Sequence, residues 1–225
     1  MKILNWEAIL GDCLEEMKNI PDGSIDCVIT DPPYLMNYRS NRRTVKEKFN
    51  KIENDIDSYD LISEYYKDCF RIMKYNTAIY SFCSWHHIEF FKIEFEKYFD
   101  LKNIIVWNKN NHWSWDLKWS YAPKHEFILF WHKWRALLKN KRIPDVIDCA
   151  KIYSDKLTHP TEKPQELLEI FIKNNTNEND IVFDWFGWTF SLPLACENTN
   201  RKWICIEKEQ SYFDIGINRI NNLNK

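Results

Sequence analysis

Asp31-Pro32-Pro33-Tyr34 is the part of this chain whose residue types and placement are best suited to chemistry. It follows residues 25–30, a short apolar and β-branched run typical of a buried strand in a parallel sheet. The two prolines end the strand and fix an extended turn. Ligands of open α/β sheets bind just beyond the carboxyl ends of strands. A carboxylate, free carbonyl groups and an aromatic ring therefore meet where they could hold a planar hydrogen-bond donor, such as the exocyclic amine of a nucleobase.

Length and composition predict one α/β domain. The chain has 225 residues, of which 44% are hydrophobic and 28% charged, enough for one buried core with little left for a second domain. No apolar run approaches the roughly 20 residues that cross a bilayer, and the N-terminus lacks a signal-peptide pattern. The seven cysteines have no metal-ligand spacing. We therefore expect reduced core thiols, no zinc site, no membrane association and a cytoplasmic location.

Basic residues are concentrated in two stretches, although the net charge of the chain is −2. Residues 39–51 carry six Lys or Arg against one Glu, and residues 102–142 carry nine against two acidic residues. A solvated face is the ordinary explanation of such a run. Two basic stretches downstream of the tetrapeptide fit a cleft that follows a phosphate backbone better.

Strand and helix patterns alternate along the chain, which predicts a doubly wound, mostly parallel sheet with an antiparallel strand or hairpin at one edge. The expected strands are 8–10, 25–30, 78–83, 103–107, 126–132, 180–184 and 203–207. The expected helices are 13–19, 60–74, 86–98, 164–174, 189–198 and 209–222. Residues 35–58 and 108–157 are interpreted as loop-rich insertions in a single domain over 1–225, and 126–132 as the antiparallel partner of 103–107.

Six motifs, taken in order, resemble those of amino-group DNA methyltransferases. They are Gly-Asp-Cys-Leu at 11–14, Asp-Pro-Pro-Tyr at 31–34, Tyr-Ala-Pro-Lys-His-Glu at 121–126, His-Pro-Thr-Glu-Lys-Pro at 159–164, Asp-Trp-Phe-Gly at 184–187 and Ile-Cys-Ile-Glu at 204–207. The tetrapeptide precedes the cofactor strand, as in the permuted β class of that family. One such motif is weak evidence, whereas six in the expected order over nearly the whole chain are strong.

The resemblance implies a Rossmann-like class I fold and methyl transfer from S-adenosylmethionine, without a metal, to a base flipped out of double-stranded DNA. Asp31 and the Pro32 carbonyl, in the turn completed by Pro33, would accept the two hydrogens of the target amine. These hydrogen bonds would activate a nitrogen whose lone pair is otherwise delocalised into the ring. Tyr34 would stack on the flipped base; simple core packing is the alternative for its ring.

The resemblance also implies a set of cofactor contacts. These residues are Asp12, Asp31, His159, Thr161, Lys163, Asp184, Phe186, Gly187 and Glu207. Glu207 matches the acid that binds ribose hydroxyls, and Asp12 is the candidate contact to the adenine of the cofactor. Residues 184–187 match the loop beside the methionine portion of the cofactor. Thr161 and Lys163 match a motif near the methionine end of the cofactor. Thr161 also suits a plain helix cap, and His159 suits an ordered turn equally well.

Target choice and partners follow from the same resemblance. Tetrapeptides that begin with Asp go more often with N6-adenine than with N4-cytosine methylation, so adenine is the predicted target and cytosine the alternative. Phosphate contacts are expected from basic residues of the two insertions, which are Arg39, Arg42, Arg43, Lys109, Lys118 and Lys124. A bacterial or phage modification setting is implied. Whether a cognate restriction endonuclease exists, and whether the chain is a monomer or a homodimer, is left open.

Aromatic residues stand where similar family members have glycine. The cofactor loop has Trp188 and Phe190 at such positions, and the others are Trp113, Trp115, Trp119 and Trp134. The chain has only 4 glycines, where average usage would give about 16, and 11 tryptophans. A ring at position 188 should block the close approach that glycine permits, so we expect weak cofactor binding.

Three interpretations of these aromatic residues compete. The source could read as glycine a codon that is translated here as tryptophan. The protein could be a catalytically impaired homologue that still binds DNA. The third interpretation is an active enzyme whose loop has adapted around large side chains.

Overall fold

The computed structural model describes residues 2–3, 6–34, 59–110, 121–152 and 162–223. Within these ranges the chain forms a nine-stranded sheet in the order β1-β2-β9-β8-β3-β4-β6-β5-β7. The strands are β1 (Lys2–Ile3), β2 (Trp6–Leu10), β3 (Ile25–Thr30), β4 (Met73–Cys83), β5 (Asp100–Asn108), β6 (His125–Lys133), β7 (Val146–Asp148), β8 (Ile181–Asp184) and β9 (Lys202–Glu207). The five strands from β2 to β4 are parallel, and β6 is antiparallel to both β4 and β5.

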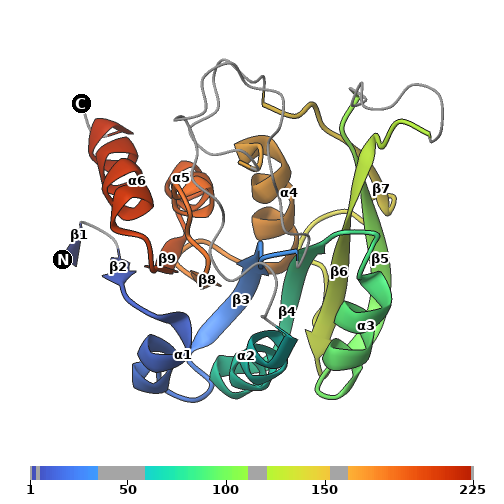
Figure 1. The fold of residues 1–225 in the computed structure, drawn as a ribbon, viewed down its shortest axis with the longest axis horizontal. Coiled ribbons are helices and arrows are strands. Elements are labelled where there is room, and N and C mark those ends of the chain that lie inside the picture. Colours follow the sequence, from blue (N-terminus) through green and yellow to red (C-terminus); the bar gives the residue numbers. More distant parts are fainter. Residues whose placement is uncertain (1, 4–5, 35–58, 111–120, 153–161, 224–225) are drawn as a thin grey trace.

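Helices of the described chain cover both faces of the sheet (Figure 1). One face carries α1 (Cys13–Glu16), the short 3-10 turn Met17–Asn19, α2 (Tyr59–Ile72) and α3 (Ile88–Glu96). The other carries α4 (Gln165–Asn175), α5 (Ser191–Asn198) and α6 (Gln210–Leu223). Each face has its own apolar core, with Ile62 and Phe91 in one and Leu167 and Ile220 in the other. This is the doubly wound α/β fold that the alternating patterns predict.

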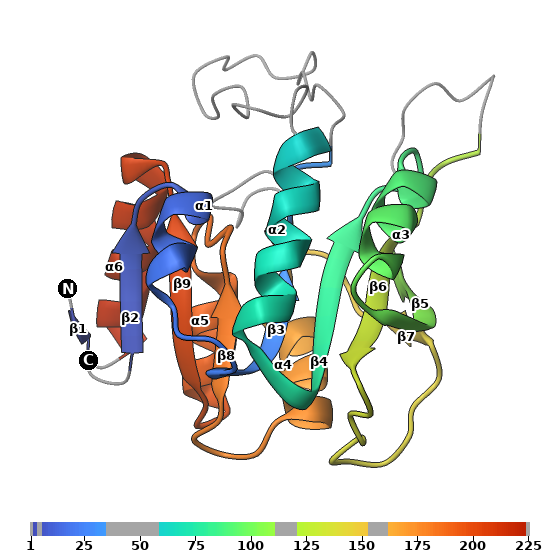
Figure 2. The ribbon, with the colours of Figure 1, turned by 90° about the horizontal axis from the view of Figure 1, so that it is seen from below.

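The centre of the sheet contains a topological switch point. β3 and β8 are parallel neighbours, but α2 carries the chain from β3 to β4 on one side and α5 carries it from β8 to β9 on the other. Figure 2 shows the strands from the face that α1, α2 and α3 cover. Open α/β sheets bind their ligands where such connections diverge. Asp31 directly follows β3 and Asp184 ends β8, so both carboxylates lie at this point.

The predicted strands and helices are confirmed with boundary shifts, and three features differ. The helix expected over 60–74 ends at Ile72, because Met73 already pairs with Ile25 of β3. The loop-rich insertion expected over 108–157 contains β7, which extends the sheet by pairing with β5. β1 was not expected. Strands of two or three residues are too short to show a periodic pattern.

The predicted burial of the cysteines is confirmed, and the described helices include no candidate membrane span. All seven cysteines are buried free thiols, and burial raises the pKa of Cys13 to about 12. None of the helices in the described ranges is long and apolar enough to cross a membrane. No group of three or more His, Cys, Asp or Glu within these ranges is arranged to hold a metal ion.

Candidate active site

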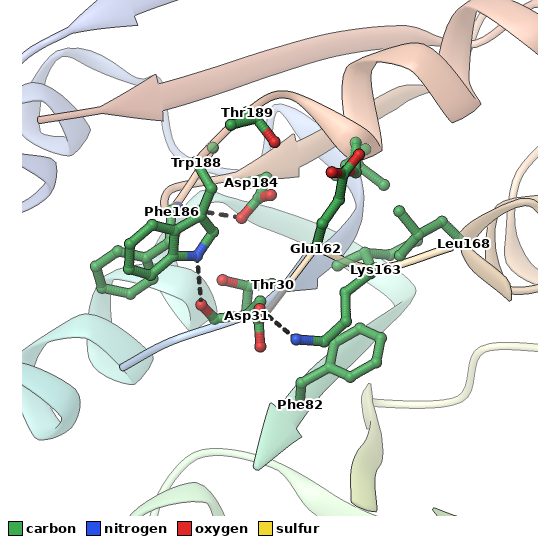
Figure 3. A pocket seen from close by; sticks show the side chains of 14 residues that line it. Thr30, Asp31, Phe82, Glu162, Lys163, Leu168, Asp184, Phe186, Trp188 and Thr189 are labelled. Atoms are coloured by element: carbon green, nitrogen blue, oxygen red, sulfur yellow. Dashed lines mark hydrogen bonds and ion pairs between the residues drawn. The ribbon is translucent and has the colours of Figure 1, made fainter. Parts of the chain in front are cut away.

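A small cavity lies at the switch point, between the carboxyl ends of β3 and β8 and the first turns of α4 and α5 (Figure 3). Asp31 comes from the end of β3, Lys163 from the segment before α4, and Asp184 from the end of β8. The loop 186–189 closes the remaining side. The cavity has a volume of only about 30 Å³, which is room for little more than one water molecule.

Asp31 is a buried carboxylate with one oxygen still available. The side chain of Lys163 donates to Asp31 Oδ2, whereas Oδ1 is buried without a hydrogen-bond partner in the described part of the chain. Burial raises the pKa of the Asp31 carboxyl, and the Lys163 ammonium group opposes that rise. Pro32 and Pro33 are buried as well and lead the chain away from the strand. An unpaired buried carboxylate oxygen is suited to accept an N–H group from a ligand.

Tyr34 reaches a charge cluster that consists of the buried Asp31 and Lys163 and the partly buried Glu126 and Lys109. The Tyr34 hydroxyl donates to Glu126 Oε2 at 3.1 Å. Glu126 pairs with Lys109, and Lys163 Nζ lies 3.6 Å from Glu126 Oε2. Burial opposes the ionisation of Glu126, but attraction to Lys163 and Lys109 outweighs it and lowers its pKa to about 2. The phenol group of Tyr34 is therefore held by an ionised carboxylate at the edge of the cavity.

The loop after β8 depends on its one glycine. Asp184 Oδ1 accepts a hydrogen bond from the Phe186 N–H at 3.1 Å, which tightens the turn, and burial raises the pKa of Asp184 well above its usual range. The Gly187 N–H donates to the Ile206 carbonyl at 2.8 Å. A Cβ atom at Gly187 would overlap the sulfur of Cys205, so a larger residue does not fit at this position.

Glu207 and Asp12 extend the same edge of the sheet. Glu207 ends β9, and its carboxylate accepts from the Trp188 N–H at 2.6 Å and the Glu209 N–H at 2.7 Å. Burial raises the pKa of Glu207 to about 7. Asp12 caps α1 by accepting from the Leu14 N–H at 3.1 Å, directly after β2. Because β2, β9 and β8 are adjacent, Asp12, Glu207 and Asp184 form a row of acids.

Trp188 lines the cavity beside Asp31 and Asp184 (Figure 3). Its backbone is left-handed, with φ 47°. The indole Nε1 donates to the Asp31 carbonyl at 3.1 Å, and the ring lies 6.5 Å from the Phe186 ring, centroid to centroid. A pocket for a ligand the size of S-adenosylmethionine needs roughly 300–1,000 Å³. The residue types fit that cofactor, but with the indole in place the space does not.

Phe190, the second aromatic residue of this loop, belongs to the core. Its φ is also positive, at 62°, but its ring is fully buried. The ring lies over Gly216, where a Cβ atom would overlap it, and makes an edge contact with Phe213 at 5.6 Å between centroids. Phe190 therefore does not obstruct the cavity, and the obstruction lies at Trp188.

The other residues predicted for the cofactor and DNA sites lie in the charge cluster, at the surface or outside the described ranges. Lys163, expected near the methionine end of the cofactor, lies in the charge cluster between Asp31 and Glu126. Lys109, expected at a phosphate, pairs with Glu126, and Lys124 is exposed. The residues outside the described ranges are Arg39, Arg42, Arg43, Lys118, His159 and Thr161, together with Trp113, Trp115 and Trp119.

Sequence reasoning missed the role of Glu126. It entered only as the last residue of the motif at 121–126, without a contact of its own. The available signal was an acid on an expected strand inside a basic stretch. An acid taken out of water there needs a cationic partner. Glu126 has two, Lys109 and Lys163.

Comparison with known proteins identifies the family. The sequence profile of the N6/N4 DNA methylases matches residues 25–218. The chain is 28% identical to the type II methyltransferase M.HinfI of Haemophilus influenzae, over 95% of this chain and 67% of that protein. It is 27% identical to the DNA adenine methyltransferase YhdJ of Escherichia coli K12, over 94% of this chain and 81% of that protein.

A solved structure shares the fold. The PvuII DNA methyltransferase, which is cytosine-N4-specific, superimposes with a TM-score of 0.78 at 18% identity, over 97% of this chain and 87% of that chain. The family uses S-adenosylmethionine as its methyl donor, in agreement with the cofactor expected from the sequence. Because the family profile covers most of the chain, this protein belongs to the N6/N4 DNA methylase family.

Proposed function

We propose that this protein is a site-specific DNA methyltransferase that acts on the N6 amine of adenine in double-stranded DNA. One observation carries the proposal: Asp31 has a buried, unpartnered carboxylate oxygen among the described residues, in a cavity that Asp184 and Gly187 also line. A target amine at this place would find its acceptor next to the row of acids on the cofactor side. This is the arrangement that the switch-point rule predicts for the two ligands.

The proposed roles of the tetrapeptide follow from its surroundings. Asp31 Oδ1 and the Pro32 carbonyl accept the two amine hydrogens and localise the lone pair of the nitrogen. Tyr34 offers its ring to the flipped base, and the hydrogen bond from its hydroxyl to Glu126 fixes the direction of the ring. Fixing the ring before the base arrives lowers the ordering cost of binding.

Two further candidates have specific support. N4-cytosine methylation is supported by the fold shared with a cytosine-N4-specific enzyme, whereas a relative named as an adenine methyltransferase supports the N6 proposal. A DNA-binding homologue without catalysis is supported by the position of Trp188 in the cavity. All three share one scaffold, so the methylated product distinguishes them.

The test is methylation in a bacterial host without its own DNA methyltransferases. The chain and its Trp188→Gly variant are expressed there, and genomic DNA is analysed by nucleoside mass spectrometry and base-modification sequencing. We expect N6-methyladenine at one fixed sequence with Trp188→Gly, and none when Asp31→Ala is added. N4-methylcytosine would instead establish the alternative chemistry. Retention of DNA without any methylation by Trp188→Gly would favour the non-catalytic homologue.

DNA recognition is proposed for the two insertions, 35–58 and 108–157, of the single domain. Lys124 is exposed and precedes β6, whose first residues pair with the carboxyl end of β4, so it lies at the sheet edge that carries Asp31. The Lys109 charge, in contrast, is already paired with Glu126. A phosphate contact contributes a salt-dependent term to affinity. Lys124→Gln should therefore weaken DNA binding and reduce its salt dependence in fluorescence anisotropy titrations.

A further inference from the structure

We infer that one side chain, the indole of Trp188, obstructs a cofactor site that is otherwise complete. We also infer that the backbone conformation at positions 188 and 134 is one that suits glycine. Only the identity of the ligand rests on the proposed function. The acids that would hold a cofactor are in place along β2, β9 and β8, and the indole of Trp188 lies among the residues that line the cavity. Removal of that ring should open the site.

The backbone supports this inference independently of the cavity. Among the tryptophans whose backbone is described, only Trp134 and Trp188 have positive φ, at 75° and 47°. Both are among the positions at which the resemblance of the sequence to the family implies glycine. The left-handed region is strained for a residue with a Cβ atom and unstrained for glycine. Neither indole belongs to the buried core clusters, and Trp134 is 73% exposed.

Phe190 lies in the same loop and is an aromatic residue for which the surrounding structure provides a packed site. It also has a positive φ, but its ring is fully buried and Gly216 makes room for it. No comparable packing surrounds Trp134, whose side chain is largely exposed. Loss of the cofactor or adaptation of the loop would explain a tryptophan at 188 but not one at the distant, exposed position 134. A codon that the source reads as glycine explains both.

The loop does not need the indole to keep its shape. The backbone N–H of Trp188 donates to Glu207 Oε2 at 2.6 Å. The N–H groups of Gly187 and Phe190 donate to the carbonyls of Ile206 and Gly187, at 2.8 Å and 2.7 Å. A glycine at 188 retains all three bonds. Substitution by glycine removes the ring contacts with Phe186 and Tyr212 and the hydrogen bond from the indole to the Asp31 carbonyl. The bicyclic indole is also similar in size to a purine, so its removal clears a space of that order.

Isothermal titration calorimetry with S-adenosylmethionine, and with the non-transferring product S-adenosylhomocysteine, tests the inference on the full chain. We expect Trp188→Gly to bind at least 100-fold more tightly than the chain itself. Trp188→Ala removes the ring but retains a Cβ atom at positive φ, so its affinity should be intermediate. Trp134→Gly is the matched control, because it corrects the same backbone conformation away from the cavity and should leave cofactor affinity unchanged.

Thermal unfolding verifies that each variant is folded before binding is interpreted. Equal affinity of the chain and a folded Trp188→Gly would overturn the inference, as would the absence of binding by that variant. Tight binding without DNA methylation would support the inference and refute the proposed function. Methylation by the unaltered chain would support the function and refute the inference. Peptide mass spectrometry of protein from its natural source should find glycine at both 134 and 188; tryptophan at either position would refute the codon explanation.

Discussion

Phe190 permits a sharp test of how packing and backbone strain compete in the cofactor loop. Its ring is fully buried over Gly216 and against Phe213, while its φ of 62° suits glycine. Substitution by alanine removes the ring and retains the strain. Substitution by glycine removes both. The two variants therefore differ in two terms, the cost of a Cβ atom in a left-handed conformation and the greater backbone freedom of glycine in the unfolded chain.

The magnitudes follow from these contacts. Truncation of a fully buried phenylalanine to alanine costs about 3–5 kcal/mol. A left-handed residue with a Cβ atom is strained by roughly 1–2 kcal/mol, and the extra backbone freedom of unfolded glycine returns roughly 0.5–1 kcal/mol of that. Phe190→Gly should therefore be more stable than Phe190→Ala by roughly 0.5–1 kcal/mol, the reverse of the order found in helices.

Urea denaturation followed by tryptophan fluorescence and far-ultraviolet circular dichroism measures both free energies of unfolding. A Phe190→Ala variant that loses less than about 1 kcal/mol would show that the ring is not a core residue. A Phe190→Gly variant less stable than Phe190→Ala would show that the left-handed backbone at 190 is not strained. Either result would also remove the contrast on which the interpretation of Trp188 depends.

Three further predictions concern stability. Trp134→Gly should raise the free energy of unfolding by roughly 0.5–1 kcal/mol in urea denaturation, because an exposed side chain at φ 75° contributes strain without packing. Gly187→Ala should cost about 1–3 kcal/mol in the same assay, because its Cβ atom would overlap Cys205; an unchanged midpoint would contradict this. Burial raises the pKa of Glu207 from 4.5 to about 7, so the folded state holds a proton that the unfolded state releases. The free energy of unfolding should then fall by on the order of 3 kcal/mol as pH rises through this window, and a Glu207→Gln variant with the same pH dependence would refute the assignment.

The sequence predicted those parts of the site that depend on strand order. Asp31, Asp184 and Glu207 each follow or end a strongly apolar strand, and the alternation of strands and helices places such ends at one edge of a sheet. The placement of these acids at one edge needed only local patterns and one rule of topology. Their cofactor roles, and the expectation that a ring at 188 would obstruct the cofactor, came from the family resemblance.

The contacts that remained hidden join residues distant in the chain. Lys163 and Asp31 are separated by 132 positions, and no local pattern predicts that their side chains meet. The resemblance implies glycine at position 190, so Phe190 was expected to be a second anomaly. Its packing partner Gly216 lies 26 positions later, on α6, and no local pattern joins the two. Three-residue β7 gave no periodic signal and forms only by pairing with β5.

Lys163 also affects how a hydrogen-bond donor reaches Asp31 of the tetrapeptide. Its ammonium group touches Asp31 and lies only 3.6 Å from Glu126. The lysine charge is therefore balanced by two carboxylates, while Asp31 Oδ1 has no hydrogen-bond partner among the described residues. An N–H group that enters the cavity would meet an acceptor on a carboxylate whose negative charge is already paired with a cation.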